Sequence, residues 1–155
     1  MLTRRLRRRT PSAVMIGTGF VEAYRLTFDK VSTDGSGKCN IEATNDRADR
    51  VYGVLFSIEK RESPDLDEAE GLGSGYQKGE VRVVSPGGAQ MAVAYIADAT
   101  NSLLLPYDWY KEFVVRGAIE HQLPAVYVRR LQTTISQRDS NDRRRARNVA
   151  ILTET

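Results

Sequence analysis

Residues 50–80 read RVYGVLFSIEKRESPDLDEAEGLGSGYQKGE, and this stretch decides the fold because it contains three different elements in succession. Residues 50–58 are strongly apolar, which is typical of a buried strand. A short helix is expected over 64–70, and a glycine-rich loop follows it. The next strand is expected over 76–84, so the stretch predicts a strand–helix–strand unit.

The ends of the short helix carry their own signals. Ser63 is a good N-cap, Pro64 suits the first helical position, and Gly71 suits the residue just past the last turn. Two further glycines at 73 and 75 let the backbone bend sharply, so a small ligand can approach it closely.

Outward from this stretch, strands cluster in the first two-thirds of the chain and helices in the last third. This order predicts an α+β fold in place of alternating βαβ units. The other expected elements are a helix over 2–8, strand character over 13–30, a short strand at 39–43, a hairpin partner over 90–97, and helices over 107–121 and 124–135.

The net charge of +3 is concentrated at the two ends. Residues 4–9 and 138–147 each hold five arginines, whereas residues 10–137 hold 13 basic and 17 acidic side chains. We expect one domain over 1–136, followed by a loose basic tail over 137–155. The arginine runs contain no aromatic side chain, so we expect solvated surface features and no nucleic-acid partner.

Composition excludes several kinds of site. With one histidine and one cysteine, no Cys/His zinc site can be assembled, and a Ser-His-Asp triad would need His121, which we expect to be solvated. Acid–base chemistry would therefore use a carboxylate, a tyrosine or a lysine.

No membrane span or signal peptide is expected. The single Cys39 cannot form an internal disulfide, which predicts a reducing, cytoplasmic setting.

Glu70 is the candidate catalytic residue. Four carboxylates occur within residues 65–70, and the simplest interpretation is a solvated acidic turn. Glu70, however, lies in the last turn, where the helix dipole disfavours negative charge, and Asp67 lies three residues before it on the same face. Both effects are expected to raise the pKa of Glu70 toward the range of a general base.

Five segments, taken in order, resemble the γ-glutamylcyclotransferase superfamily over nearly all of residues 2–133. They contain a V-x-G-V-L-[FY] strand, a helix ending D-x-x-E-G, a tyrosine after the glycines, a strand with an inward tyrosine, and a Y-x-x-x-[IV]-x-x-G-A helix followed by L-P. The segments are RVYGVLFSIEK (50–60), LDEAEG (66–71), GSGYQKGEVRVV (73–84), AVAYIAD (92–98) and WYKEFVVRGAIEHQLPAVYVRRL (109–131).

The resemblance implies a small mixed β-barrel flanked by helices, with a cavity at one end. It implies an enzyme that cyclises a γ-glutamyl group, releasing 5-oxoproline and an amine or amino acid, with Glu70 as general acid and base. The implied partner is a small γ-glutamyl compound, and neither a metal nor a nucleotide cofactor is implied. Tyr76, Tyr95 and Tyr110 match positions that line or contact the pocket.

The start of the chain departs from the family pattern. MLTRRLRRRTPSA resembles the family's first helix, but the strand and Tyr-Gly-Ser-Asn loop that precede it are absent. Met1 stands just after that loop, at the helix end whose N–H groups would bind the substrate carboxylate. Either the start of the sequence was placed internally, or the chain is a family member that has lost part of its site. A loss is expected to weaken binding and to leave a sheet edge open beside residues 52–56. A homodimer, or the segment 149–152, would then fill the gap.

Two other functions stay open from the sequence. One is a catalytically impaired member of the same superfamily that binds a small ligand or a protein through the cavity. The other is an arginine-rich nucleic-acid binder, which the arrangement of the basic residues disfavours.

Overall fold

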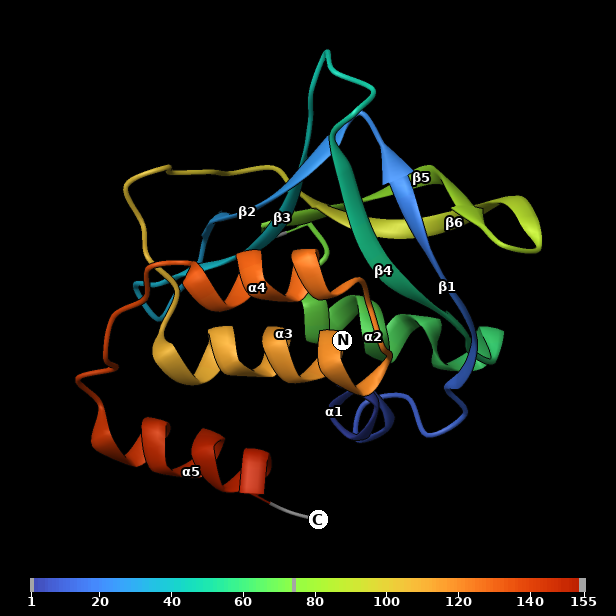
Figure 1. The fold of residues 1–155 in the computed structure, drawn as a ribbon. Coiled ribbons are helices and arrows are strands. Elements are labelled where there is room, and N and C mark those ends of the chain that lie inside the picture. Colours follow the sequence, from blue (N-terminus) through green and yellow to red (C-terminus); the bar gives the residue numbers. More distant parts are fainter. Residues whose placement is uncertain (1, 74, 154–155) are drawn as a thin grey trace.

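The computed structural model describes residues 2–73 and 75–153, and its elements confirm a mixed α+β fold (Figure 1). None of the helices within these residues is both long and apolar enough to cross a membrane. In chain order the elements are α1 (Thr3–Arg7), β1 (Val14–Glu22), β2 (Tyr24–Val31), β3 (Gly37–Ala43), β4 (Arg50–Ser57), η1 (Lys60–Glu62), α2 (Ser63–Glu70), β5 (Tyr76–Ser85), β6 (Gly88–Ala97), α3 (Asp108–Glu120), α4 (Ala125–Thr133) and α5 (Asp142–Thr153).

The strands form two antiparallel sheets, one of four strands in the order β4-β1-β5-β6 and one made of β2 and β3. The closed, mixed barrel that the resemblance implied is therefore not formed by the described residues. Ala23 has a left-handed φ of 59°, so the chain turns between β1 and β2 and leaves the first sheet. Where β3 approaches β6, the side chain of Asn40 accepts a hydrogen bond from Ala97 N (2.9 Å) in place of a backbone ladder.

One glycine sets how closely β1 and β5 approach. The two strands pair at Phe20 and Val84. A Cβ atom on Gly19 would lie 2.6 Å from the carbonyl oxygen of Val84, which is well inside van der Waals contact. Gly19 is therefore required for this strand crossing.

Helix α3 packs on both of its sides and joins the parts of the core. Toward α1 and α5 it contributes to a buried cluster with Leu2 and Leu152, and toward α4 to a second cluster with Tyr127 and Leu131 (Figure 1). The α3 residues of the first cluster include Trp109 and Phe113. The cavity described below lies between α3 and the sheets.

The C-terminal arginine run belongs to a packed helix. The prediction that residues 149–152 fill a sheet gap is wrong, because they lie in α5 against the first cluster. The expectation of a loose tail is also wrong, because Leu152 is only 6% exposed. Two arginines expected to be solvated form ion pairs: Arg144 with Asp139 (2.6 Å) and Arg145 with Asp108 (2.7 Å).

His121 differs from the prediction as well. Its side chain is only 5% exposed, its Nε2 lies 3.0 Å from Thr3 Oγ1, and its ring contacts the ring of Phe56. The reason is that α1 packs over the end of α3, which the helical pattern of either segment alone does not reveal.

Candidate functional site

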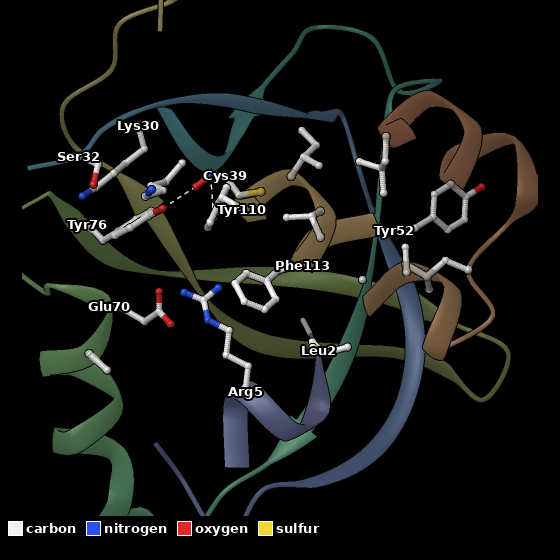
Figure 2. A pocket seen from close by; sticks show the side chains of 18 of the residues that line it. Leu2, Arg5, Lys30, Ser32, Cys39, Tyr52, Glu70, Tyr76, Tyr110 and Phe113 are labelled. Atoms are coloured by element: carbon white, nitrogen blue, oxygen red, sulfur yellow. Dashed lines mark hydrogen bonds between the residues drawn. The ribbon is translucent and has the colours of Figure 1, made fainter. Parts of the chain in front are cut away.

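A cavity of about 370 Å³ lies between α1, the end of α2, α3 and the two sheets (Figure 2). Its apolar part is formed by residues of the helical core and the sheets, including Leu2, Tyr52 and Phe113. Its polar part is strongly charged. The charged side chains on the wall are Arg5, Arg9, Lys30, Lys38 and Glu70.

Glu70 is placed on the cavity wall by the end of α2. Gly71 has a φ of 73°, and its backbone N–H caps the helix on the carbonyl of Glu68 (3.0 Å). The expected cap at the other end is not formed, because Ser63 is already helical and Glu62 stands at the N-cap. The Glu70 side chain is 19% exposed, and its Oε1 accepts a hydrogen bond from Arg9 Nη1 at 2.8 Å.

Asp67 does not face Glu70 as the sequence argument assumed. Its Oδ2 pairs with Lys78 Nζ (2.6 Å), and its Oδ1 accepts a hydrogen bond from the Tyr95 hydroxyl (2.6 Å). Lys78 first, and then Tyr95, lower the pKa of Asp67 below its usual range. Asp67 and Glu70 therefore have separate partners. Arg9, 61 residues from Glu70, could not be found from local spacing.

Tyr76 and Tyr110 meet at the backbone of Cys39. The Tyr76 hydroxyl donates to the Cys39 carbonyl oxygen (2.6 Å), and the Tyr110 hydroxyl accepts from Cys39 N (3.1 Å). Burial raises the pKa of both tyrosines well above the usual value. Burial likewise raises the pKa of the Cys39 thiol to about 11. All three groups are therefore neutral near pH 7, and both tyrosine rings line the cavity.

Of the other two residues predicted for the site, only Tyr95 is described by the structure, and it lies outside the cavity wall. Tyr95, on β6, donates its hydroxyl hydrogen bond to Asp67 of α2 and is not among the residues that line the cavity. Met1 falls outside the described residues. Three of the site residues predicted from the sequence, Glu70, Tyr76 and Tyr110, line the same cavity in the structure.

Lys38 is a cavity residue that sequence reasoning missed. Its Nζ pairs with Asp34 Oδ2 (2.7 Å) and lies 4.6 Å from the centre of the Tyr110 ring. Burial lowers the pKa of Lys38. No motif signals this role, because an isolated lysine in a turn-rich loop is usually a solvated charge.

The side chains of this wall can transfer a proton through the Glu70 carboxylate, and its cationic side chains can bind an anionic ligand beside it. Its polar part combines one carboxylate and four cations with the hydroxyl groups of Tyr76 and Tyr110. Within residues 2–73 and 75–153, no group of three or more histidine, cysteine, aspartate or glutamate side chains could hold a metal ion.

Comparison with known proteins gives one consistent result. The AIG2-like family matches residues 50–131, a little over half of the chain. The γ-glutamylcyclotransferase of Bos taurus is 28% identical over 138 residues, covering 86% of this chain and 73% of that protein. Its Homo sapiens counterpart is 28% identical over 137 residues, covering 85% and 72%.

Solved structures agree. A γ-glutamyl cyclotransferase structure superposes with a TM-score of 0.80 at 29% identity, covering 88% of this chain and 83% of that one. A structure of an uncharacterized protein from Homo sapiens superposes with a TM-score of 0.84 at 26% identity, covering 99% and 92%.

Proposed function

Since the chain belongs to the AIG2-like family within the γ-glutamylcyclotransferase-like superfamily, we propose that it is a γ-glutamyl cyclotransferase-type enzyme. The α-amine of a γ-glutamyl compound attacks its own γ-carbonyl carbon. A new C–N bond closes the five-membered ring, and the original amide C–N bond breaks. The products are 5-oxoproline and the released amine or amino acid.

The observation that carries this proposal is the inward-facing carboxylate of Glu70 (Figure 2). Glu70 takes a proton from the α-ammonium of the substrate, and the attacking nitrogen gives up a second proton as the ring closes. Both protons go to the leaving nitrogen, which departs as an ammonium group, so no net proton is gained or lost. The ion pair with Arg9 fixes the orientation of this carboxylate. Because nucleophile and electrophile belong to one molecule, holding the glutamyl chain bent supplies much of the rate enhancement.

The tyrosines have separate parts in this proposal. Tyr76 donates its proton to Cys39, so it holds the wall of the cavity in place. Tyr110 accepts a hydrogen bond from Cys39 N, which leaves its own proton for the oxygen of the reacting carbonyl group. Tyr95 acts at a distance, by holding Asp67 and thereby the end of α2.

The direct test measures 5-oxoproline released from a panel of γ-glutamyl amino acids and γ-glutamyl amines. We expect Glu70→Gln to reduce the rate about 100-fold or more, because a general acid–base group contributes about 10²–10⁴-fold. The matched control is Glu68→Gln, which changes an exposed carboxylate on the same helix and should leave the rate unchanged. Thermal unfolding of both variants checks that the fold is kept.

An unchanged rate in a folded Glu70→Gln variant would contradict the assigned role. If the wild-type chain binds γ-glutamyl compounds but converts none of them, the function is that of a small-ligand binding module.

The homodimer expected through the open edge near residues 52–56 stays a prediction. In the structure β4, which contains these residues, is the edge strand of the larger sheet.

A further inference from the structure

The ammonium group of Lys38 is held by its own loop. Its Nζ pairs with Asp34 Oδ2 (2.7 Å) and donates to Ser36 Oγ (2.7 Å). Ser36 is fully buried, and its backbone N–H and hydroxyl both donate to Asp34 Oδ1 (3.0 and 2.7 Å). The Lys38 side chain is only 15% exposed, so its position is fixed, unlike that of a flexible surface lysine.

Three aromatic rings, at the start of α3 and just before it, lie around the same ammonium group. The centres of the Tyr107, Trp109 and Tyr110 rings lie 5.6, 4.9 and 4.6 Å from Lys38 Nζ. These are cation–π distances, and such contacts strengthen when the cation is shielded from water. Lys38 therefore links the beginning of β3 to the part of α3 that supplies Tyr110 to the cavity.

The residue that follows Lys38 binds both cavity tyrosines. The ladder between β2 and β3 is irregular beside Cys39, because its register shifts across residues 27–30. Cys39 N donates to the Tyr110 hydroxyl (3.1 Å), and its carbonyl oxygen accepts from the Tyr76 hydroxyl (2.6 Å) (Figure 2). Irregular strand positions are common beside active sites, where they redirect side chains.

Two consecutive residues thus hold the Tyr110 side chain at two points. Lys38 contacts the ring, and Cys39 binds the hydroxyl. The preceding Gly37 packs so closely that a Cβ atom on it would overlap the carbonyl oxygen of Phe28, which fixes the backbone there. Loss of the ring contact would let the hydroxyl move, and a displacement of about 1 Å can slow a reaction about 100-fold.

We propose that Lys38 is a positioning residue, which holds the hydroxyl of Tyr110 where it can donate to the oxygen of the reacting carbonyl group. This inference rests on the proposed function, from which it takes the role of Tyr110. Lys38 acts through Tyr110 and not on the reacting atoms, because its ammonium group is bound by Asp34 and Ser36. A cation that bound the substrate directly would affect binding instead.

The kinetics of 5-oxoproline release separate these two roles. Lys38→Met removes the charge and keeps an unbranched side chain, and we expect kcat to fall about tenfold or more while KM changes less. The matched control, Lys60→Met, makes the same change at an exposed position outside the cavity and should alter neither constant. An unchanged kcat in a folded Lys38→Met variant, with or without a raised KM, would overturn the proposal.

A double-mutant cycle tests whether Lys38 acts through Tyr110. Tyr110→Phe removes the hydroxyl, so adding Lys38→Met to that variant should lower kcat little further. A merely structural role would lower kcat by the same factor with and without the hydroxyl, and this result would refute the proposal. If Lys38→Met does not fold because Asp34 is left unpaired, the cycle is run with Lys38→Met and Asp34→Asn together, which removes both charges.

Hydrogen exchange followed by NMR tests the positioning without any turnover. In Lys38→Met the protection factor of the Cys39 amide should fall about tenfold or more, whereas that of the buried Val81 in β5 should not change. Lys60→Met should change neither. Unchanged protection of Cys39 in a folded Lys38→Met variant would overturn the positioning role. A chain that loses this protection but releases no 5-oxoproline in its wild-type form would contradict the catalytic proposal alone.

Discussion

At the scale of single residues, Asp139 is the most completely buried charge of the chain's last segment. Its side chain is 0% exposed, and it accepts hydrogen bonds from Arg144 and from the indole Nε1 of Trp109 (3.0 Å). The bonds from Arg144 hold the pKa of Asp139 well below its usual range. An ionised Asp139 therefore links α5 to α3.

This link predicts a pH dependence of stability. The folded-state pKa of Asp139 is depressed, so its contribution is fully present above the unfolded value of about 3.9 and is lost as the pH falls below it. Asp139→Asn should lower the unfolding midpoint at pH 7, and the difference between the variant and the wild-type chain should be smaller at pH 3 than at pH 7. Asp142→Asn is the control, because its pair with Arg138 is exposed. An equal difference between the variant and wild-type midpoints at pH 7 and pH 3 would contradict the stabilising role of the ionised Asp139.

The candidate site shows which residues a sequence can identify. Glu70 could be predicted because its helix ends, with their proline and glycine signals, lie within eight residues of it. The cations of the cavity wall could not be predicted in this way. Arg5, Arg9 and Lys30 come from segments that reach the cavity beside Glu70 only when the chain folds. In the sequence an arginine that enters a cavity looks the same as its solvated neighbours.

At the scale of elements, strands and helices with an apolar pattern were predicted to within one or two residues. The exceptions have physical reasons. Strand character over 13–30 does not show the break at Ala23, because no glycine or proline marks that left-handed residue. Helix α5 could not be predicted because its four arginines fall at the start of residues 142–153 and give that half no apolar face, so the short apolar stretch after them shows no helical pattern.

The packing of α5 predicts that Leu152 contributes measurably to stability. Leu152→Ala removes a side chain from the cluster around Trp109 and Phe113, and such changes cost about 2–5 kcal/mol of unfolding free energy. Ile135→Ala is the control, because Ile135 is 72% exposed and its truncation should cost little. Urea unfolding of the two variants measures the difference. A similar small effect at both positions would show that α5 does not pack in solution as it does here.

At the scale of the whole molecule, α1 connects the C-terminal helix to the cavity. On one side, Arg4 Nη2 donates to the Leu152 carbonyl oxygen (2.9 Å), and Arg116 Nη1 donates to the same atom (2.6 Å). On the other side, α1 and the residues that flank it supply Leu2, Arg5 and Arg9 to the cavity wall. Figure 1 shows α1 and α5 on the same side of α3.

Residues 137–155 are therefore expected to matter for ligand binding, although none of the described residues 137–153 lines the cavity. A chain ending at residue 136 should unfold at a lower temperature and bind γ-glutamyl compounds more weakly, because α1 loses the partners that hold its side chains at the cavity wall. Leu152→Ala keeps the chain whole. It should lower the unfolding temperature and weaken ligand binding, each by less than the truncation does, so the test holds even if the shortened chain does not fold. Replacing exposed Arg143 and Arg147 by glutamine should change neither. If the Leu152→Ala chain is destabilised but binds with an unchanged Kd, then α1 keeps its place without α5, and the coupling between the last helix and the cavity is refuted.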